Sequence, residues 1–304
     1  MRVRLVATDL DGTLVRTDGT ISVRTCRALR AAEDAGLGVV FVTGRPPRWM
    51  GPVADATGHT GLAVCANGAL LYDMHTERVV ASTLLEPAVL LAVAERLRSA
   101  IPGLRFAVEY GPGFGHEPGY RHHWAIGGVR IRVGPLAELA DRPAAKLLAR
   151  HPSMACDELL AVAVELVGAE VAVTSSSHEA LLEIGASGVT KASALADLAA
   201  GAGVAATDVL AFGDMPNDLP MLAWAGRAVA VANAHPTVLA AADEITGSND
   251  EDGVAAVVER ILAGQPGQPG QPGQPGNAGR TAAGRGRPGV AGGTAATGGP
   301  LDGA

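Results

Sequence analysis

The sequence predicts an α/β protein in which a doubly wound parallel sheet carries a second, smaller α+β domain inserted into it. Short, continuous apolar runs alternate with helical patterns in residues 1–83 and again after residue 186. Such runs are typical of strands that are buried on both faces of a parallel sheet. Residues 84–186 mix strand-like and helix-like pieces with glycine-rich loops. We therefore expect a core formed by residues 1–83 and 187–262, with the inserted domain over 84–186.

Five apolar runs are the predicted core strands, and polar or glycine-rich residues follow each of them. The runs are Val3–Ala7, Val39–Val42, Leu62–Ala66, Val209–Phe212 and Ala228–Val231. A helix is predicted over Ser22–Ala35, because Gly36 stands in the position of a C-terminal cap. Ligands of open α/β sheets bind at the carboxyl ends of the strands, so we expect the residues after these runs to share one site.

The inserted region is predicted to contain two helices and several short strands. The helices are Glu86–Ala100 and Cys156–Val167, and the strands are Arg105–Tyr110, Val129–Val133, 146–149, Glu170–Thr174 and Ala180–Ile184. Glycines and two prolines crowd Gly111–Tyr120, which we expect to be a loop.

The last forty residues differ in composition from the rest of the chain. From Gly264 the chain repeats Gln-Pro-Gly four times and then continues rich in glycine, alanine, arginine and proline. So few apolar side chains cannot offset the entropy of ordering, which predicts a disordered tail over residues 263–304. Its arginines make it weakly basic and leave a role open, although a solvated extension without catalytic consequence is the simpler interpretation.

Composition excludes several classes of protein. Hydrophobic residues make up 48% of the 304 residues and aromatic residues only 3%, so the core is built from alanine, valine and leucine. The formal net charge of -7 gives no electrostatic case for binding nucleic acid or an anionic membrane. Three separated cysteines argue against a disulfide framework or a structural zinc site. With no signal peptide and no long apolar run, we expect a cytoplasmic protein; monomer or homo-oligomer stays open.

Two carboxylates follow the first predicted strand, in the run Asp9-Leu10-Asp11-Gly12-Thr13-Leu14. If the chain turns between Asp9 and Asp11, both can face one point. The first can then attack phosphorus to give an aspartyl-phosphate, while the second protonates the leaving oxygen and later activates water. Gly12 permits the sharp turn that this arrangement needs. Taken alone, however, an aspartate pair after a strand is more often a turn or a helix cap.

Three further segments supply the other parts of a phosphoryl-transfer site. Thr43 offers a hydroxyl and backbone amides to phosphate oxygens, and Lys191, at a helix start, offers a positive charge. Asp214 and Asp218, which flank Asn217, are hard oxygen ligands of the kind that Mg²⁺ prefers. Each feature alone is weak, since a turn or a solvated side chain explains it. Their joint occurrence at strand ends and helix starts favours the catalytic interpretation.

These segments resemble the motifs of the haloacid dehalogenase superfamily, and more narrowly its Cof-type phosphatases with a type IIB cap. The matching runs are Asp9–Leu14, Thr43–Arg45, Gly188–Lys191 and Gly213–Asp218. The resemblance covers residues 1–262, and an inserted domain between the second and third motifs is what indicates the type IIB cap. The chain departs from the pattern at Ala232, where the family usually has glycine before Asn233.

The resemblance implies a Rossmann-like core and a magnesium-dependent phosphatase of small phosphorylated metabolites, such as sugar phosphates or phosphorylated cofactors. Asp9 would be the nucleophile and Asp11 the general acid/base. Magnesium would be held by the Asp9 carboxylate, the Asp11 backbone carbonyl and Asp214, while Asp218 would support it through water. The phosphate would be bound by the Leu10 backbone, Thr43, Gly44, Lys191 and Asn217.

The inserted domain would close over the core and select the leaving group, as the resemblance implies. Glu109 and His116 are our candidates for contact with the substrate, against the equal alternative of a solvent-exposed loop. His122 and His123 could be metal ligands, but adjacent histidines on a strand point to opposite faces, which favours packing or surface roles. A phosphomutase, or a non-catalytic protein that binds a phosphorylated metabolite, remains an alternative function.

Overall fold

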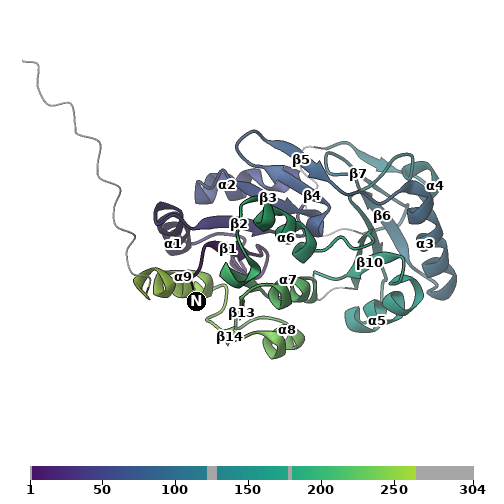
Figure 1. Cartoon of the computed structure of the whole chain (residues 1–304). Helices are drawn as coiled ribbons and strands as arrows, with labels where there is room; N and C mark the ends of the chain where they lie inside the picture. Colours follow the sequence, from purple (N-terminus) through teal and green to yellow (C-terminus); the bar gives the residue numbers. More distant parts are fainter. Residues whose placement is uncertain (1, 122–128, 177–179, 265–304) are drawn as a thin grey trace, which may run out of the picture. The chain divides into compact units, whose positions relative to one another are not determined.

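The computed structural model describes residues 2–121, 129–176 and 180–264, which form two β-sheets with helices packed around them (Figure 1). The larger sheet has the strand order β14-β13-β12-β1-β2-β3-β4-β5, and we call it the core sheet. The smaller, with the order β10-β11-β9-β6-β7-β8, is the cap sheet. The predicted α/β class, with a parallel sheet and an inserted α+β part, is confirmed.

The core sheet is parallel from β14 through β3, and β4 and β5 extend it antiparallel at one edge. Its strands are β1 (Leu5–Thr8), β2 (Gly38–Val42), β3 (Leu62–Cys65), β4 (Leu70–Asp73), β5 (Arg78–Ser82), β12 (Val209–Gly213), β13 (Arg227–Ala230) and β14 (Glu244–Ile245). The central strands β1 and β12 are buried along their whole length. Continuous apolar runs therefore marked strands covered on both faces, as expected of a parallel sheet.

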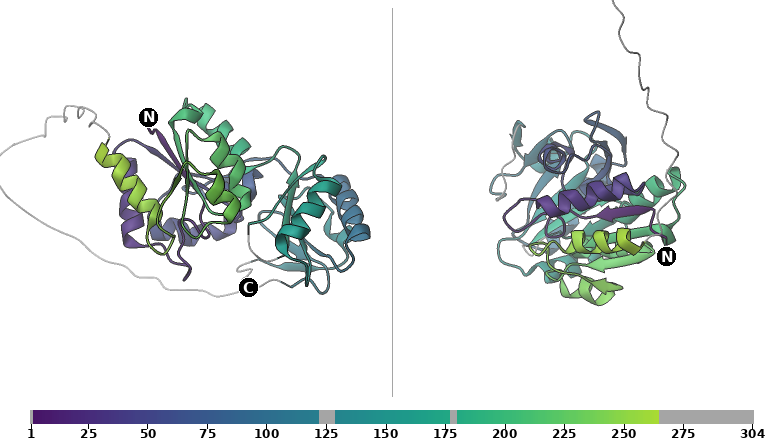
Figure 2. Two further views of the ribbon diagram at one scale, coloured as in Figure 1. Left: turned by 90° about the horizontal axis from the view of Figure 1, so that it is seen from below. Right: turned by 90° about the vertical axis from the view of Figure 1, so that its left-hand side faces the viewer.

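Helices cover both faces of the core sheet (Figure 2). Those α-helices are α1 (Val23–Asp34), α2 (Gly51–Thr57), α6 (Lys191–Gly201), α7 (Leu219–Trp224), α8 (Pro236–Ala241) and α9 (Gly253–Gly264). Short 3₁₀ helices are η1 (Pro47–Trp49), η2 (Ala66–Gly68), η3 (Ala206–Asp208) and η4 (Pro216–Asp218). In Figure 2, α1 and α9 lie together on one face of the sheet, and α6 and α7 lie on the other. The predicted helix after Ser22 is confirmed, with the Ser22 side chain as its N-cap.

The cap sheet is mostly antiparallel and has one helical face. It contains β6 (Arg105–Glu109), β7 (Phe114–His116), β8 (Ile131–Val133), β9 (Lys146–Arg150), β10 (Val171–Thr174) and β11 (Leu181–Ala186), with α3 (Pro87–Ala100), α4 (Leu136–Leu139) and α5 (Cys156–Val167). Side chains of β9 alternate: Leu147 packs in the apolar core with α3 and α5, whereas Lys146 and Leu148 face a cavity. In β11, Leu182 likewise packs in the apolar core, whereas Glu183 faces the cavity.

One prediction for the inserted region is wrong. Residues 111–120 are not loop throughout, because β7 pairs antiparallel with β6 and parallel with β8. Phe114 is buried there, and a Cβ on Gly115 would lie 2.9 Å from a methyl carbon of Leu139. The glycine that suggested a loop instead allows this strand to pack closely against α4.

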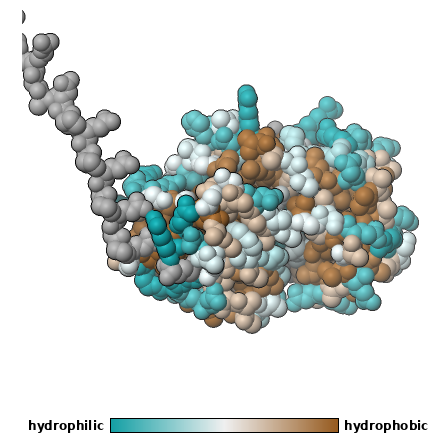
Figure 3. All heavy atoms as spheres, viewed as in Figure 1, coloured by the Kyte–Doolittle hydropathy of each residue, from teal (hydrophilic) through white to brown (hydrophobic). Residues whose placement is uncertain are grey.

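No helix among residues 2–121, 129–176 and 180–264 is long and apolar enough to cross a membrane. On the face that Figure 3 shows, hydrophilic side chains are interspersed with hydrophobic ones. The expectations for His122, His123 and the tail from residue 265 lie outside the described residues, and the residue boundaries of the inserted domain stay predictions.

Candidate active site

A cavity of about 350 Å³ opens where the carboxyl ends of the core strands face the cap sheet. Asp9 follows β1, Gly44 follows β2 and Asn217 follows β12, so residues far apart in sequence meet at one edge, as expected. The remaining walls come from both sheets. They are Asp11, Arg45, Pro46, Trp49 and Met215 on the core side, with Glu109, Phe114, Lys146, Leu148, Ser176, Leu181 and Glu183 on the cap side.

Lys191 joins two carboxylates at the base of this site. Its Nζ lies 2.7 Å from Oδ1 of Asp9 and 2.6 Å from Oδ1 of Asp218, and all three side chains are buried. Burial alone would lower the pKa of Lys191, but the two carboxylates raise it above its ordinary value. Lys191, at the start of α6, therefore stays charged and holds the Asp9 carboxylate in place.

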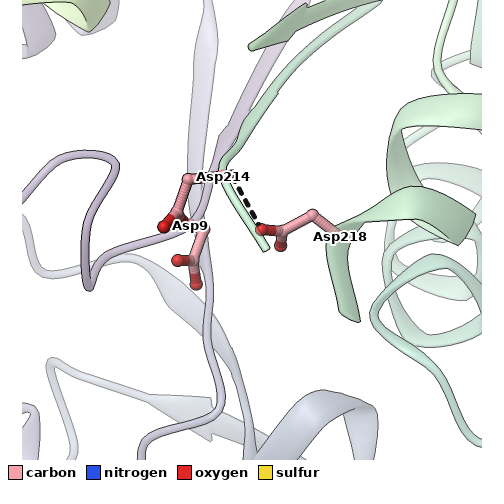
Figure 4. Close-up of side chains that lie close together, drawn as sticks. All are labelled: Asp9, Asp214 and Asp218. Carbon is pink, nitrogen blue, oxygen red and sulfur yellow. Dashed lines mark hydrogen bonds between the residues drawn. The ribbon is translucent and has the colours of Figure 1, made fainter. Parts of the chain in front are cut away.

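Asp214 lies beside Asp9, and Figure 4 shows the two side chains close together, with Asp218 on the other side of the loop. Oδ1 of Asp214 accepts a hydrogen bond from Thr13 Oγ1 at 2.7 Å. Asp218 fixes the loop from the other side, since its Oδ2 accepts from the backbone N–H groups of Asp214 and Met215 at 3.0 and 3.1 Å. Two features require glycine at position 12. Its φ of +81° is strained for other residues, and a Cβ would lie 2.3 Å from Oδ2 of Asp214.

Negative charge exceeds positive charge in this cluster. Carboxylate oxygens of Asp9, Asp214 and Asp218 lie within 4.8 Å of one another, with Lys191 as the cation between two of them. Burial, reinforced by the neighbouring carboxylates, raises the pKa of Asp9 well above its ordinary value despite Lys191. Burial and then Asp218 raise the pKa of Asp214 to about 7. A buried, oxygen-only set with excess negative charge fits a hard divalent cation.

The two oxygens of Asp218 are both engaged within the protein, one by Lys191 and the other by backbone N–H groups. Direct coordination of a cation would therefore fall to Asp9 and Asp214, with Asp218 in a supporting position. This arrangement agrees with the sequence-based expectation, although the ligand set stays a prediction.

Asp11 lines the same cavity as Asp9, and Arg45 holds its side chain. Its side chain is 56% exposed and forms a two-pronged ion pair with Arg45, with Nε and one terminal nitrogen 2.8 and 2.5 Å from its oxygens. Both residues line the cavity. The guanidinium fork fixes the plane of the Asp11 carboxylate at the cavity wall.

The expected phosphate ligands follow β1, β2 and β12 or stand at the start of α6. Thr43 is buried and its Oγ1 accepts from the backbone N–H of Arg45 at 3.0 Å, which shapes the turn after β2. Asn217 donates through Nδ2 to Oδ1 of Asn67 at 3.1 Å. The Leu10 carbonyl accepts from the Leu14 amide at 2.9 Å, which closes the turn after Asp9. Phosphate binding by these groups stays a prediction.

The two candidate cap residues have different surroundings. Glu109 lines the cavity, but its oxygens accept from Arg48 at 2.6 and 2.7 Å, and Oε1 also accepts from the Gly111 amide at 2.9 Å. Among the described residues, His116 is not part of the cavity wall, and its Nδ1 lies 2.8 Å from the backbone oxygen of Glu117. Glu109 therefore joins the cap sheet to η1, and contact of either residue with substrate stays a prediction.

Sequence reasoning missed two charged residues of the cap sheet. Lys146 and Glu183 form a buried ion pair between β9 and β11 and line the cavity. A signal for them was present, because Lys146 directly precedes the apolar run Leu147–Ala149 of β9, and Glu183 lies within the otherwise apolar strand β11. Such residues are rarely buried unless they are paired.

Comparison with known proteins assigns the family. The family model for haloacid dehalogenase-like hydrolases matches residues 6–258. A pyridoxal phosphate phosphatase of Escherichia coli is 30% identical, over 85% of this chain and 98% of the relative. A 5-amino-6-(5-phospho-D-ribitylamino)uracil phosphatase of Bacillus subtilis is 29% identical, over 84% of this chain and 94% of the relative.

A solved structure of a subclass IIB sugar phosphatase shares the fold, with a TM-score of 0.73 at 20% identity over 85% of this chain and 99% of that one. The family model spans both the core sheet and the cap sheet, as does this structural match. The chain belongs to the haloacid dehalogenase-like hydrolase family, as an enzyme of its Cof-type phosphatase group.

Proposed function

We propose that this enzyme is a magnesium-dependent phosphatase that hydrolyses small phosphorylated metabolites through an aspartyl-phosphate on Asp9. The observation that carries the proposal is the buried contact of Asp9 with Lys191 inside a cluster of carboxylates. A buried carboxylate that is held by a lysine and faces a cavity can act as a nucleophile. A protein that only bound phosphate esters would gain nothing from so much negative charge in its binding site.

The chemistry divides between two aspartates. An oxygen of Asp9 attacks phosphorus, the new Asp9–phosphorus bond forms, and the bond from phosphorus to the ester oxygen breaks as Asp11 gives that oxygen a proton. Water then attacks phosphorus, Asp11 takes the proton of the water, and inorganic phosphate leaves with Asp9 restored. Lys191, whose Nζ contacts Asp9, would offset the negative charge that develops next to the nucleophile.

The residues that would hold Mg²⁺ are Asp9, the backbone carbonyl of Asp11, and Asp214, with support from Asp218. When bound, the ion would offset the repulsion between the phosphate dianion and the anionic nucleophile. Excess negative charge among buried oxygen ligands supports this part of the proposal.

The cavity suits a small leaving group. Its volume of about 350 Å³ is at the low end for ligand sites, and the cap sheet closes one side of it. Trp49 and Phe114 give it aromatic walls, and Leu148 and Leu181 add apolar surface. These features favour a phosphorylated cofactor or sugar phosphate over a polymer. The relatives named for pyridoxal phosphate and for a ribitylaminouracil phosphate are consistent with that class.

Hydrolysis of p-nitrophenyl phosphate with Mg²⁺ tests the proposal. We expect Asp9→Asn to lower kcat by at least about 10⁴-fold while leaving thermal unfolding nearly unchanged, because the amide cannot attack phosphorus. Release of inorganic phosphate, rather than transfer back to an alcohol of the substrate, distinguishes a phosphatase from a phosphomutase. An Asp9→Asn protein with wild-type activity would refute the nucleophile assignment.

A further inference from the structure

Four buried polar side chains form a continuous chain from the cap sheet to the loop after β12. Lys146 pairs with Glu183 and also donates through Nζ to the backbone oxygen of Gly44 at 2.7 Å. Glu183 Oε2 accepts from Nδ2 of Asn67 at 2.9 Å. Asn67 Oδ1 in turn accepts from Nδ2 of Asn217 at 3.1 Å. All four side chains belong to buried residues.

The charge of Glu183 fixes the direction of both hydrogen bonds that the Asn67 side chain makes in this chain. An ionised carboxylate can only accept hydrogen bonds, so Asn67 must turn its Nδ2 toward Glu183 and its Oδ1 toward Asn217. Asn217 must then donate through Nδ2. Burial alone would raise the pKa of Glu183, but the adjacent Lys146 charge and hydrogen bonds hold it below its ordinary value, so the carboxylate stays ionised at neutral pH.

This chain ends among the predicted phosphate ligands. Gly44 packs directly against it, since a Cβ there would lie 3.2 Å from Oδ1 of Asn67 and 3.5 Å from Oε2 of Glu183. Asn217 lines the cavity, and a phosphate oxygen requires a donor, which the Asn217 side chain offers only through Nδ2. One hydrogen of that Nδ2 is used by Asn67, which leaves the second for the phosphate.

We propose that Glu183 is a positioning residue that acts through Asn67 to keep the Nδ2 of Asn217 turned toward the phosphate. Lys146 supports this arrangement, because it pairs with Glu183 and also donates to the Gly44 carbonyl. The inference rests on the proposed function, because it takes Asn217 and Gly44 as phosphate ligands. Since Lys146 and Glu183 belong to the cap sheet, the phosphate site reaches its full geometry only when that sheet supplies them. Leaving-group enclosure and phosphate binding are thereby coupled.

Glu183→Gln should reverse the direction of the two hydrogen bonds of Asn67, with almost no change in the shape of the side chain at position 183. Lys146 can only donate, so the introduced amide turns its oxygen to the lysine and its nitrogen to Asn67. Asn67 must then rotate its own amide, and Asn217 must present an oxygen where it now presents Nδ2. With Mg²⁺ present, we expect the inhibition constant of inorganic phosphate to rise about tenfold, the effect of one hydrogen bond to a charged group. The kcat/KM for p-nitrophenyl phosphate should fall by a similar factor.

Glu117→Gln is the matched control. Glu117 is also a buried cap glutamate in an ion pair, with Arg98 at 2.6 Å, and its second oxygen accepts from the Phe106 amide at 3.0 Å. It does not line the cavity. We expect its loss to reduce stability while inhibition by phosphate stays within twofold of wild type. A purely structural role of buried cap glutamates would instead give both variants the same profile.

Asn67→Gly gives a second, independent variant. Asn67 has a φ of +57°, which glycine adopts freely, so this substitution removes the amide and keeps the turn. We expect the same rise in the phosphate inhibition constant, and no further rise when Glu183→Gln is added, because both changes break one chain.

The inference is overturned if either folded variant binds phosphate within twofold of wild type, or if the two effects multiply. Should Glu183→Gln not fold, the result with Asn67→Gly decides. A wild-type protein that hydrolyses no phosphomonoester would instead refute the proposed function.

Discussion

The core site and the cavity face of the cap sheet both bury charged side chains, but they balance those charges differently. In the core, the three neighbouring carboxylates of Asp9, Asp214 and Asp218 share one lysine, Lys191, which contacts the first and the last of them. On the cap face, Glu183 is paired with Lys146, as Glu109 is with Arg48 of the core.

The difference separates two uses of buried charge. In a balanced pair each charge is neutralised by its partner, so the pair can hold neighbouring groups in place. Lys146 holds the Gly44 carbonyl and Glu183 holds Asn67 in this way. An unbalanced cluster is costly in the folded protein unless a cation joins it. The pKa of Asp9, which burial raises and the neighbouring carboxylates raise further, is consistent with that cost. We therefore propose that the core cluster carries out the chemistry and that the cap pairs position neighbouring groups.

After Asp9→Asn, the largest effect should follow from Lys191→Met, which removes the cation of the core cluster. We expect kcat/KM to fall by about 10³-fold, because the developing charge loses its preorganised partner. In chelator the free energy of unfolding should fall by about 3–5 kcal/mol, as a buried ion pair loses one member. Urea unfolding and p-nitrophenyl phosphate kinetics provide the two measurements. Activity within tenfold of wild type would contradict the role of the lysine.

Magnesium should stabilise the core cluster and leave the cap pairs unaffected. At a concentration about 100-fold above its Kd, the ion should raise the free energy of unfolding by about 2.7 kcal/mol. Thermal unfolding with and without Mg²⁺ measures this effect. Asp214→Asn should lose the response, whereas Glu117→Gln should retain it. If the Asp214→Asn protein responded like wild type, the ion would bind elsewhere.

Arg45→Ala should produce a smaller effect, through Asp11. Without the guanidinium fork the Asp11 carboxylate loses its fixed plane, so we expect kcat to fall about tenfold for an alkyl phosphate, whose leaving oxygen needs a proton. The loss should be smaller for p-nitrophenyl phosphate, which has a good leaving group. Arg45→Lys should restore little, because an ammonium cannot make the two-pronged contact. Equal losses on both substrates would show that Arg45 acts on something other than proton transfer.

The residues of the candidate core site could be selected from sequence because each follows a predicted strand or starts a predicted helix, and these features occur together. Asp9 and Asp214 follow buried strands, and Lys191 starts a helix after Gly188. Parallel strands place their carboxyl ends at one edge, so knowledge of the fold brings these residues together although Asp9 and Lys191 are 182 positions apart.

The cap face could not be predicted in this way. Lys146 and Glu183 meet because β9 and β11 are neighbours in an antiparallel sheet, and the sequence pattern does not determine which strands pair. The Arg45–Asp11 contact depends on the reach and rotamer of a long side chain, which no motif specifies. Strand β7 was missed because its glycine serves close packing rather than a turn.

The smallest effects should appear in the pH dependence of stability, where the two regions should differ in sign. The pKa of Glu183 is lowered in the folded protein, from an ordinary value of 4.5, so its contribution is present above that value and lost as the pH falls through the folded pKa. The free-energy difference between wild type and Glu183→Gln, from urea unfolding, should therefore narrow in acid.

In chelator, the contribution of Asp214 to stability should change with pH in the opposite direction. Its folded pKa, about 7, lies above its ordinary value of 3.8, so the folded state binds the extra proton and stability falls as the pH rises from about 4 to 7. Asp214→Asn should flatten that part of the curve, and saturating Mg²⁺ should do the same by replacing the proton. If stability in chelator rose over this interval and Asp214→Asn left the slope unchanged, the core cluster would be as balanced as the cap pairs, and charge imbalance would no longer mark the catalytic region.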